Sequence, residues 1–193
     1  KALHIAPQYD NAVHSDTADI EISVYNSTTE DFSGNIHICS YDLSGKLLEV
    51  FDAPCKVSAD TVAAAAAKFT FRNIPDGVLF VRYSLLDEQD NIADSGYVIK
   101  SNREVPYAQL LQQKICPIKA ELCGDQLTLK NTGKQIVSAL SVECDNDQSV
   151  YFSDGCMMLL PGEEVTVTAS FAGGRKVPLY ISGFGVPYQR MKV

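Results

Sequence analysis

Short apolar runs that alternate with polar residues recur along the chain, and turn-forming residues separate them. In residues 19–25 the side chains of Ile20, Ile22 and Val24 share one face of an extended segment, and polar side chains share the other. Strands with turn signals about every 8 to 12 residues are typical of antiparallel β-sandwiches. The pattern therefore predicts an all-β fold of two tandem immunoglobulin-like antiparallel β-sandwich domains.

Residues 1–103 form the first predicted domain, and its start is already a strand-like run. Residues 26–35 are rich in turn formers. The Asp-Leu-Ser-Gly tetrad at 42–45 suits a hairpin, because Gly45 can adopt the positive φ that such a turn needs. A further turn is expected at 73–77. Strands are expected over residues 19–25, 36–41, 46–57, 62–71, 78–86 and 92–99.

Residues 62–71 are ambiguous, because five consecutive alanines favour a helix by intrinsic propensity. A run this short does not nucleate a helix by itself. It also ends in the alternating sequence Phe69-Thr70-Phe71. We expect a strand with one face of small residues.

Residues 104–117 are predicted to connect the two domains. Pro106 and Pro117 interrupt the strand pattern, and the stretch between them suits one helical turn, with its leucines packed at the domain junction. Residues 118–193 form a smaller second β-sandwich, in which Pro161-Gly162 is a strong turn signal. Its strands are expected over residues 118–122, 126–130, 138–144, 157–160, 164–171 and 179–184.

The composition excludes several kinds of partner. The net charge is −8, and the chain lacks the clustered Lys and Arg that bind nucleic acid or an anionic membrane surface. The longest apolar stretch, residues 62–67, is far shorter than the about 20 residues that span a bilayer. The chain begins at Lys1 with neither an initiator Met nor the order of a signal peptide, so we expect a segment of a longer polypeptide.

The cysteines allow two interpretations. An even number is compatible with three disulfides in an oxidising compartment, or with reduced thiols scattered through the strands. Cys39 and Cys55 would become neighbours if their strands pair. No Cys-x-x-Cys spacing is present, so a zinc site is not expected. The six are Cys39, Cys55, Cys116, Cys123, Cys144 and Cys156.

We find no catalytic motif, and we predict no catalytic, cofactor-binding or metal-ligating residue and no cofactor. Of the histidines His4, His14 and His37, the last is flanked by two isoleucines on its strand, so its side chain is expected on the solvent face. The acidic residues at 145–147 with Asp154 offer oxygen ligands but lack the spacing of a calcium loop, so we interpret them as turn residues.

Carbohydrate binding has weak support in the sequence. There are nine tyrosines and no tryptophan, and Tyr25, Tyr83 and Tyr97 fall inside strand patterns where packing is expected. The tripeptide that begins at Asn26 fits the acceptor pattern for N-glycosylation.

Several longer strings resemble known β-sandwich sequences. Residues 41–48 are similar to a strand–turn–strand in glycoside hydrolase family 2. In the second half, the strings at 127–133, 140–144, 151–155, 159–167 and 181–188 follow one another as in the C-terminal immunoglobulin-like domains of β-mannosidases of that family.

This resemblance implies a parent enzyme that releases terminal β-linked mannose. Its chemistry needs two carboxylates on a TIM barrel, the acid/base glutamate directly after an asparagine. The chain has no Asn-Glu dipeptide and no alternating βα pattern, so no catalytic residue transfers to it. The expected partner is the catalytic barrel of the same polypeptide, and a periplasmic or secreted location is favoured. The alternative is a carbohydrate-binding or adhesion module of a cell-surface protein.

Overall fold

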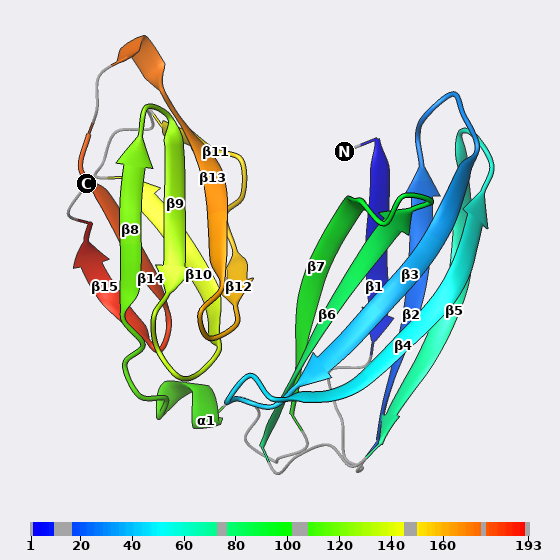
Figure 1. Ribbon diagram of the computed structural model, residues 1–193, viewed down its shortest axis with the longest axis horizontal. Coiled ribbons are helices and arrows are strands. Elements are labelled where there is room, and N and C mark those ends of the chain that lie inside the picture. Colours follow the sequence, from blue (N-terminus) through cyan, green and yellow to red (C-terminus); the bar gives the residue numbers. More distant parts are fainter. Residues whose placement is uncertain are drawn as a thin grey trace. The chain divides into compact units, whose positions relative to one another are not determined.

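The structure is a computed structural model. It describes residues 2–9, 17–72, 77–101, 108–144, 150–174 and 177–191. The chain divides into two compact units, Lys1–Tyr107 and Ala108–Val193. Each unit consists of antiparallel sheets (Figure 1), which confirms the predicted all-β sandwich fold.

The first unit pairs a three-stranded sheet, in the order β1-β2-β5, with a four-stranded sheet, in the order β4-β3-β6-β7. All of their pairings are antiparallel. Its strands are β1 (Leu3–Tyr9), β2 (Thr17–Asn26), β3 (Phe32–Tyr41), β4 (Leu47–Val57), β5 (Thr61–Arg72), β6 (Val78–Asp87) and β7 (Ile92–Ser101).

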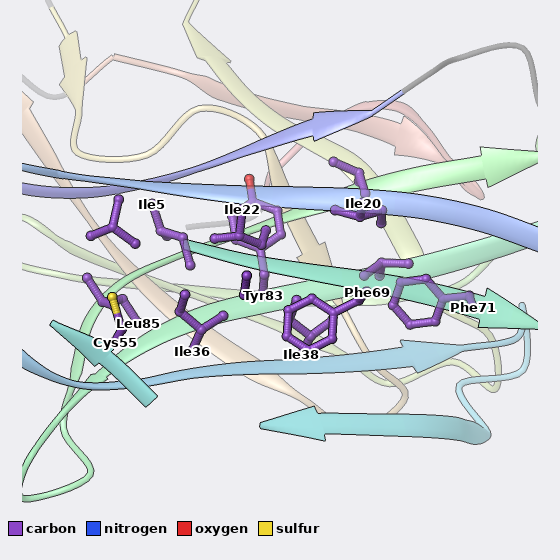
Figure 2. Packing of buried hydrophobic residues seen from close by; sticks show 14 of the residues in the cluster. Ile5, Ile20, Ile22, Ile36, Ile38, Cys55, Phe69, Phe71, Tyr83 and Leu85 are labelled. Atoms are coloured by element: carbon purple, nitrogen blue, oxygen red, sulfur yellow. The ribbon is translucent and has the colours of Figure 1, made fainter. Parts of the chain in front are cut away.

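The core of the first unit lies between these two sheets, where alternate residues of each strand meet (Figure 2). Ile20 and Ile22 of β2 are fully buried, as the alternation predicted, and so is Ile38 of β3. Phe51 adds aromatic contacts, with its ring centroid 5.3 Å from that of Phe69. In β2 and β3, the apolar faces that the alternation predicted are therefore the faces that form the core.

The alanine-rich segment is a strand, as predicted, but it is not regular. The pairing of β5 with β2 shifts between Ile22 and Val24, and Ala65 has a φ of 48° at this irregularity. The Ala65 amide donates to the Ser23 hydroxyl at 3.2 Å, so the displaced backbone group keeps a partner. Ala67, where the ladder is regular again, is buried.

The turn predicted at residues 42–45 is confirmed. Gly45 has a φ of 81°, and the Asp42 carboxylate accepts from the Ser44 amide at 2.8 Å. The longer turn expected over 26–35 was wrong in extent, because β3 already begins at Phe32, whose side chain packs into the core. Most of the turn expected at 73–77 lies outside the described residues.

The second unit contains two four-stranded sheets, in the orders β12-β10-β14-β15 and β11-β13-β9-β8. Its core contains the fully buried Leu127 and Leu129 of one sheet and Leu140 of the other. Its elements are α1 (Ala108–Leu111), β8 (Ile118–Cys123), β9 (Gln126–Asn131), β10 (Val137–Cys144), β11 (Val150–Phe152), β12 (Met157–Leu159), β13 (Glu164–Phe171), the 3-10 turn η1 (Ala172–Gly174), β14 (Leu179–Phe184) and β15 (Val186–Arg190).

The sequence did not predict β11 or β15. β11 has three residues, and only Val186 of β15 is buried. Neither strand therefore shows an alternation of buried apolar and exposed polar residues from which it could be predicted. The helical turn expected between the prolines is α1, in which Leu110 is buried and Leu111 is 80% exposed. Cys116, in the predicted connector, packs into the core of the second unit. Within the described ranges, no helix is long and apolar enough to cross a membrane.

Candidate functional site

Three ionisable side chains meet on the face of β3 and β4 that points away from the core. His37 and Cys39 are two residues apart on β3, so they share the face opposite Ile36 and Ile38. Asp52 of β4 lies directly across the ladder from His37. The strand periodicity and the β3–β4 register together position this cluster.

The cluster is a chain of hydrogen bonds. His37 Nδ1 lies 2.7 Å from Asp52 Oδ1, and His37 Nε2 lies 3.0 Å from Cys39 Sγ. An ionised carboxylate only accepts hydrogen bonds, so the neutral form of His37 would donate from Nδ1 and present the Nε2 lone pair to the thiol. The thiol of Cys39, the imidazole of His37 and the carboxylate of Asp52 are thus ordered in space as nucleophile, base and orienting group. This arrangement can activate a thiol or hydroxyl.

The surroundings of Cys39 keep its proton in place at neutral pH. Burial is the largest effect on the pKa of the Cys39 thiol and raises it. A hydrogen bond with Tyr41 lowers this pKa, the charge of Asp52 raises it, and the charge of Arg82 lowers it, leaving the pKa above its ordinary value. Cys39 is 8% exposed, whereas the His37 side chain is 36% exposed.

The strand pattern predicted His37 on the solvent face, but no association of His37 with Cys39 or Asp52 was expected from it. The proximity of His37 and Cys39 could have been predicted from the sequence, because residues two positions apart in a strand share a face. Asp52 is fifteen positions away, and only the register of β3 with β4 brings it to His37.

A second histidine has a different environment. His4 Nδ1 lies 2.8 Å from Asp94 Oδ2, and the same carboxylate oxygen accepts from the Ile5 amide at 3.0 Å. These bonds join β1 to β7, on the edges of the two sheets of the first unit. We interpret the pair as structural, since Asp94 is buried and uses its oxygen on the backbone. His14 lies outside the described residues.

All six cysteines are free thiols, so the structure corresponds to the reduced alternative. The strands that carry Cys39 and Cys55 do pair, but the two residues are not neighbours. Cys55 pairs with Gly34 and faces the core, while Cys39 pairs with Val50 and faces outward. Burial raises the pKa of the Cys55 thiol as well.

The acidic residues weighed as calcium ligands are only partly described. Residues 145–147 lie outside the described part of the chain, and the Asp154 carboxylate accepts from the Cys156 amide at 3.4 Å. Among the residues whose positions the structure describes, no three His, Cys, Asp or Glu side chains form a group that would hold a metal ion.

Some of the tyrosines are packed in a core, and others are exposed on the surface. Tyr83 is 8% exposed within the first core, in keeping with the packing role expected for it. Tyr180 and Tyr188 of the second unit stack with ring centroids 5.2 Å apart, and Tyr188 is 61% exposed. Tyr151 is 70% exposed. Exposed aromatic rings of this kind are the feature that a carbohydrate would contact.

The predicted glycosylation acceptor is a buried structural residue. Asn26 is 2% exposed, and its Nδ2 donates to the backbone oxygens of Glu30 at 2.8 Å and Val57 at 3.2 Å. Its Oδ1 accepts from the Thr28 amide at 3.0 Å. A glycan on Nδ2 would displace these bonds, so the folded chain does not offer this acceptor.

Comparison with known proteins gives one similarity at the sequence level. The chain is 28% identical over 166 residues to β-mannosidase B of Thermothelomyces thermophilus, covering 80% of this chain and 18% of that protein. No protein-family profile matches the chain.

Solved structures share the fold over nearly the entire chain. An exo-chitosanase of Amycolatopsis orientalis matches with a TM-score of 0.68 and 19% identity, over 100% of this chain and 26% of the enzyme. A β-D-mannosidase of Dictyoglomus thermophilum matches with a TM-score of 0.60 and 14% identity, over 96% of this chain and 22% of the enzyme.

The sequence similarity and the shared fold point to the same group of enzymes. The chain resembles the β-sandwich region of β-mannosidase-like enzymes of glycoside hydrolase family 2, as its sequence strings predicted. It spans about a fifth of the length of β-mannosidase B and about a quarter of the exo-chitosanase.

Proposed function

We propose that this chain is a non-catalytic accessory region, from the C-terminal part of a family 2 glycoside hydrolase that removes terminal β-linked mannose. The observation that carries the proposal is the 28% identity with β-mannosidase B over 166 residues. The lack of a paired-carboxylate motif on a barrel framework supports the non-catalytic part of it.

The proposed partner is the catalytic barrel of the same polypeptide. Rigid sandwiches of this kind would cover an apolar face of the barrel and hold its loops in position. The proposed domain division follows the sequence analysis, with sandwiches at residues 1–103 and 118–193 and a connector at 104–117. Fold similarity alone does not establish a role, so the proposal requires an activity test.

The test compares three proteins on an aryl β-mannoside: this 193-residue chain, the full-length parent, and the parent lacking this region. We expect turnover by the parent, none by the isolated chain, and reduced activity or a lower melting temperature for the truncated parent. Turnover by the isolated chain would refute the proposal. An aryl β-glucosaminide, assayed in parallel, tests the substrate against the chitosanase similarity.

The exposed rings of Tyr151 and Tyr188 favour one alternative, a carbohydrate-binding module. Calorimetric titration of the chain with mannose oligomers distinguishes the two functions. Submillimolar binding that is lost in Tyr188→Ala would support the binding module. Heat effects no larger than dilution would support the accessory role.

A further inference from the structure

We propose that Cys39 is a thiolation site, at which the thiol attacks a small disulfide with His37 as general base and Asp52 as the positioning residue. The inference is independent of the proposed glycosidase context. It depends on the hydrogen-bonded chain on the outward face of β3 and β4.

The geometry is held by regular structure. β3 and β4 pair without a register shift from Phe32 to Ser40, which includes the whole cluster. Groups on paired strands keep their orientation better than groups on loops. The 3.0 Å separation of Cys39 Sγ from His37 Nε2 allows direct transfer of the thiol proton.

A base is needed because the thiol is not already ionised. The titratable or charged groups that act on Cys39 are Tyr41 on its own strand, Asp52 on β4 and Arg82 on β6, together with His37. Burial outweighs the groups that stabilise the thiolate, so the pKa of the thiol stays raised. Its reaction near neutral pH then depends on removal of the proton during the attack itself.

The step balances with the disulfide as the only co-reactant. The proton of Cys39 Sγ passes to His37 Nε2, and the sulfur electron pair forms a bond to the nearer sulfur of the disulfide. The S–S bond of the reagent breaks, and the departing thiolate takes the proton from His37 Nε2 and leaves as a thiol. Cys39 is oxidised to a mixed disulfide, and one sulfur of the reagent is reduced.

The exposure of Cys39 sets the size of the reagent. The Cys39 residue is 8% exposed, so we expect a slim molecule to reach it and a protein thiol to be excluded. The other thiols supply internal standards. Cys123 is exposed at the end of β8, and Cys55 is buried in the first core. An unassisted thiol as covered as Cys39 would react far more slowly than Cys123.

The experiment uses bis(2-hydroxyethyl) disulfide, which is small and uncharged, on the 193-residue chain after full reduction. Acid quenching and peptide mass spectrometry give the rate of adduct formation at each cysteine. His37→Gln removes the base, Asp52→Asn removes the orienting charge, and Cys39→Ser identifies the adduct. Unchanged circular dichroism and an unchanged Cys123 rate show that each variant is folded.

At pH 7 we expect Cys39 to react at least as fast as Cys123. His37→Gln should slow Cys39 about a hundredfold, near the lower end of what a positioned base contributes. Asp52→Asn should slow it by a smaller factor. In His37→Gln the rate should rise about tenfold per pH unit with the thiolate fraction, and in the natural chain less steeply.

Two results would overturn the proposal. One is a Cys39 rate as low as that of Cys55 in the natural chain. The other is a His37→Gln rate equal to that of the natural chain at every pH. Because neither result involves turnover of a glycoside, the outcome is separate from that of the proposed function.

Discussion

Asn131 and Asn26 perform the same structural task in the two units. Each ends a strand that has neighbours on both sides, and each Oδ1 accepts from the amide two residues ahead. Asn131 Nδ2 also donates to the backbone oxygens of Gln135 at 2.8 Å and Leu159 at 3.1 Å. In each unit a single buried side chain therefore satisfies backbone groups of separate segments.

Asn131→Asp should lower the free energy of unfolding of the second unit by about 3 kcal/mol, because two backbone oxygens lose their donor and a buried group gains a charge. Asn131 is fully buried, which leaves no water to replace the lost bonds. Urea unfolding measures the change. Gln126→Ala, an exposed position on the same strand, is the control, and its change should stay within about 0.5 kcal/mol.

The loss in free energy of unfolding caused by Asn131→Asp should depend on pH. Burial raises the pKa of the new carboxyl in the folded state above its unfolded value, so the folded variant binds a proton more tightly. The difference from the natural chain should therefore shrink as pH falls toward about 4, where the neutral acid donates again. An equal deficit at pH 4 and pH 7 would contradict this account.

At the scale of elements, the alanine run of β5 contains a local strain. Ala65 has a φ of 48°, a conformation that costs a residue with a Cβ about 1–2 kcal/mol. Ala64 is its neighbour in the same strand and is also exposed. Phe69 and Phe71, which follow the irregularity on β5, point into the core.

Ala65→Gly should raise the free energy of unfolding by about 0.5–1 kcal/mol, because relief of the strain exceeds the added entropy of the unfolded chain. Ala64→Gly, the matched control, should lower it by about 0.5–1 kcal/mol, because only the entropy changes. Thermal melting of the two variants beside the natural chain gives the signs. Losses of equal size at both positions would mean that the strand is unstrained.

At the scale of the whole molecule, each unit has a core of its own. The apolar clusters of the first and second units share no residue. The second unit also contains Cys116, whose amide donates to Gly185 O at 2.8 Å, so its compact part begins before β8.

We expect residues 108–193 to fold when produced alone. Far-ultraviolet circular dichroism should show β structure, and urea should unfold the fragment in one transition. A fragment starting at residue 118 is the control, and it should be less stable because it lacks α1 and Cys116. An unfolded 108–193 fragment would mean that the units depend on each other.

The sequence by itself determined the fold class, most strands and which faces are buried. Alternation is a local property, and burial of Ile20, Ile22 and Val24 follows from it whatever partner they meet. Turn chemistry was also local, as Gly45 shows. Where alternation was weak, as in β11 and β15, the sequence predicted nothing.

Only the tertiary structure decided which distant residues meet. Register is set by pairing along the full length of two strands, so a shift of one residue would have moved Asp52 to the other face from His37. The same holds for the carbonyls that meet Asn131, and for the separation of Cys39 from Cys55 on paired strands. The two-residue spacing in the sequence placed His37 and Cys39 on one face of β3. The long-range pairing of β3 with β4 then brought the Asp52 carboxylate to His37 and completed the site.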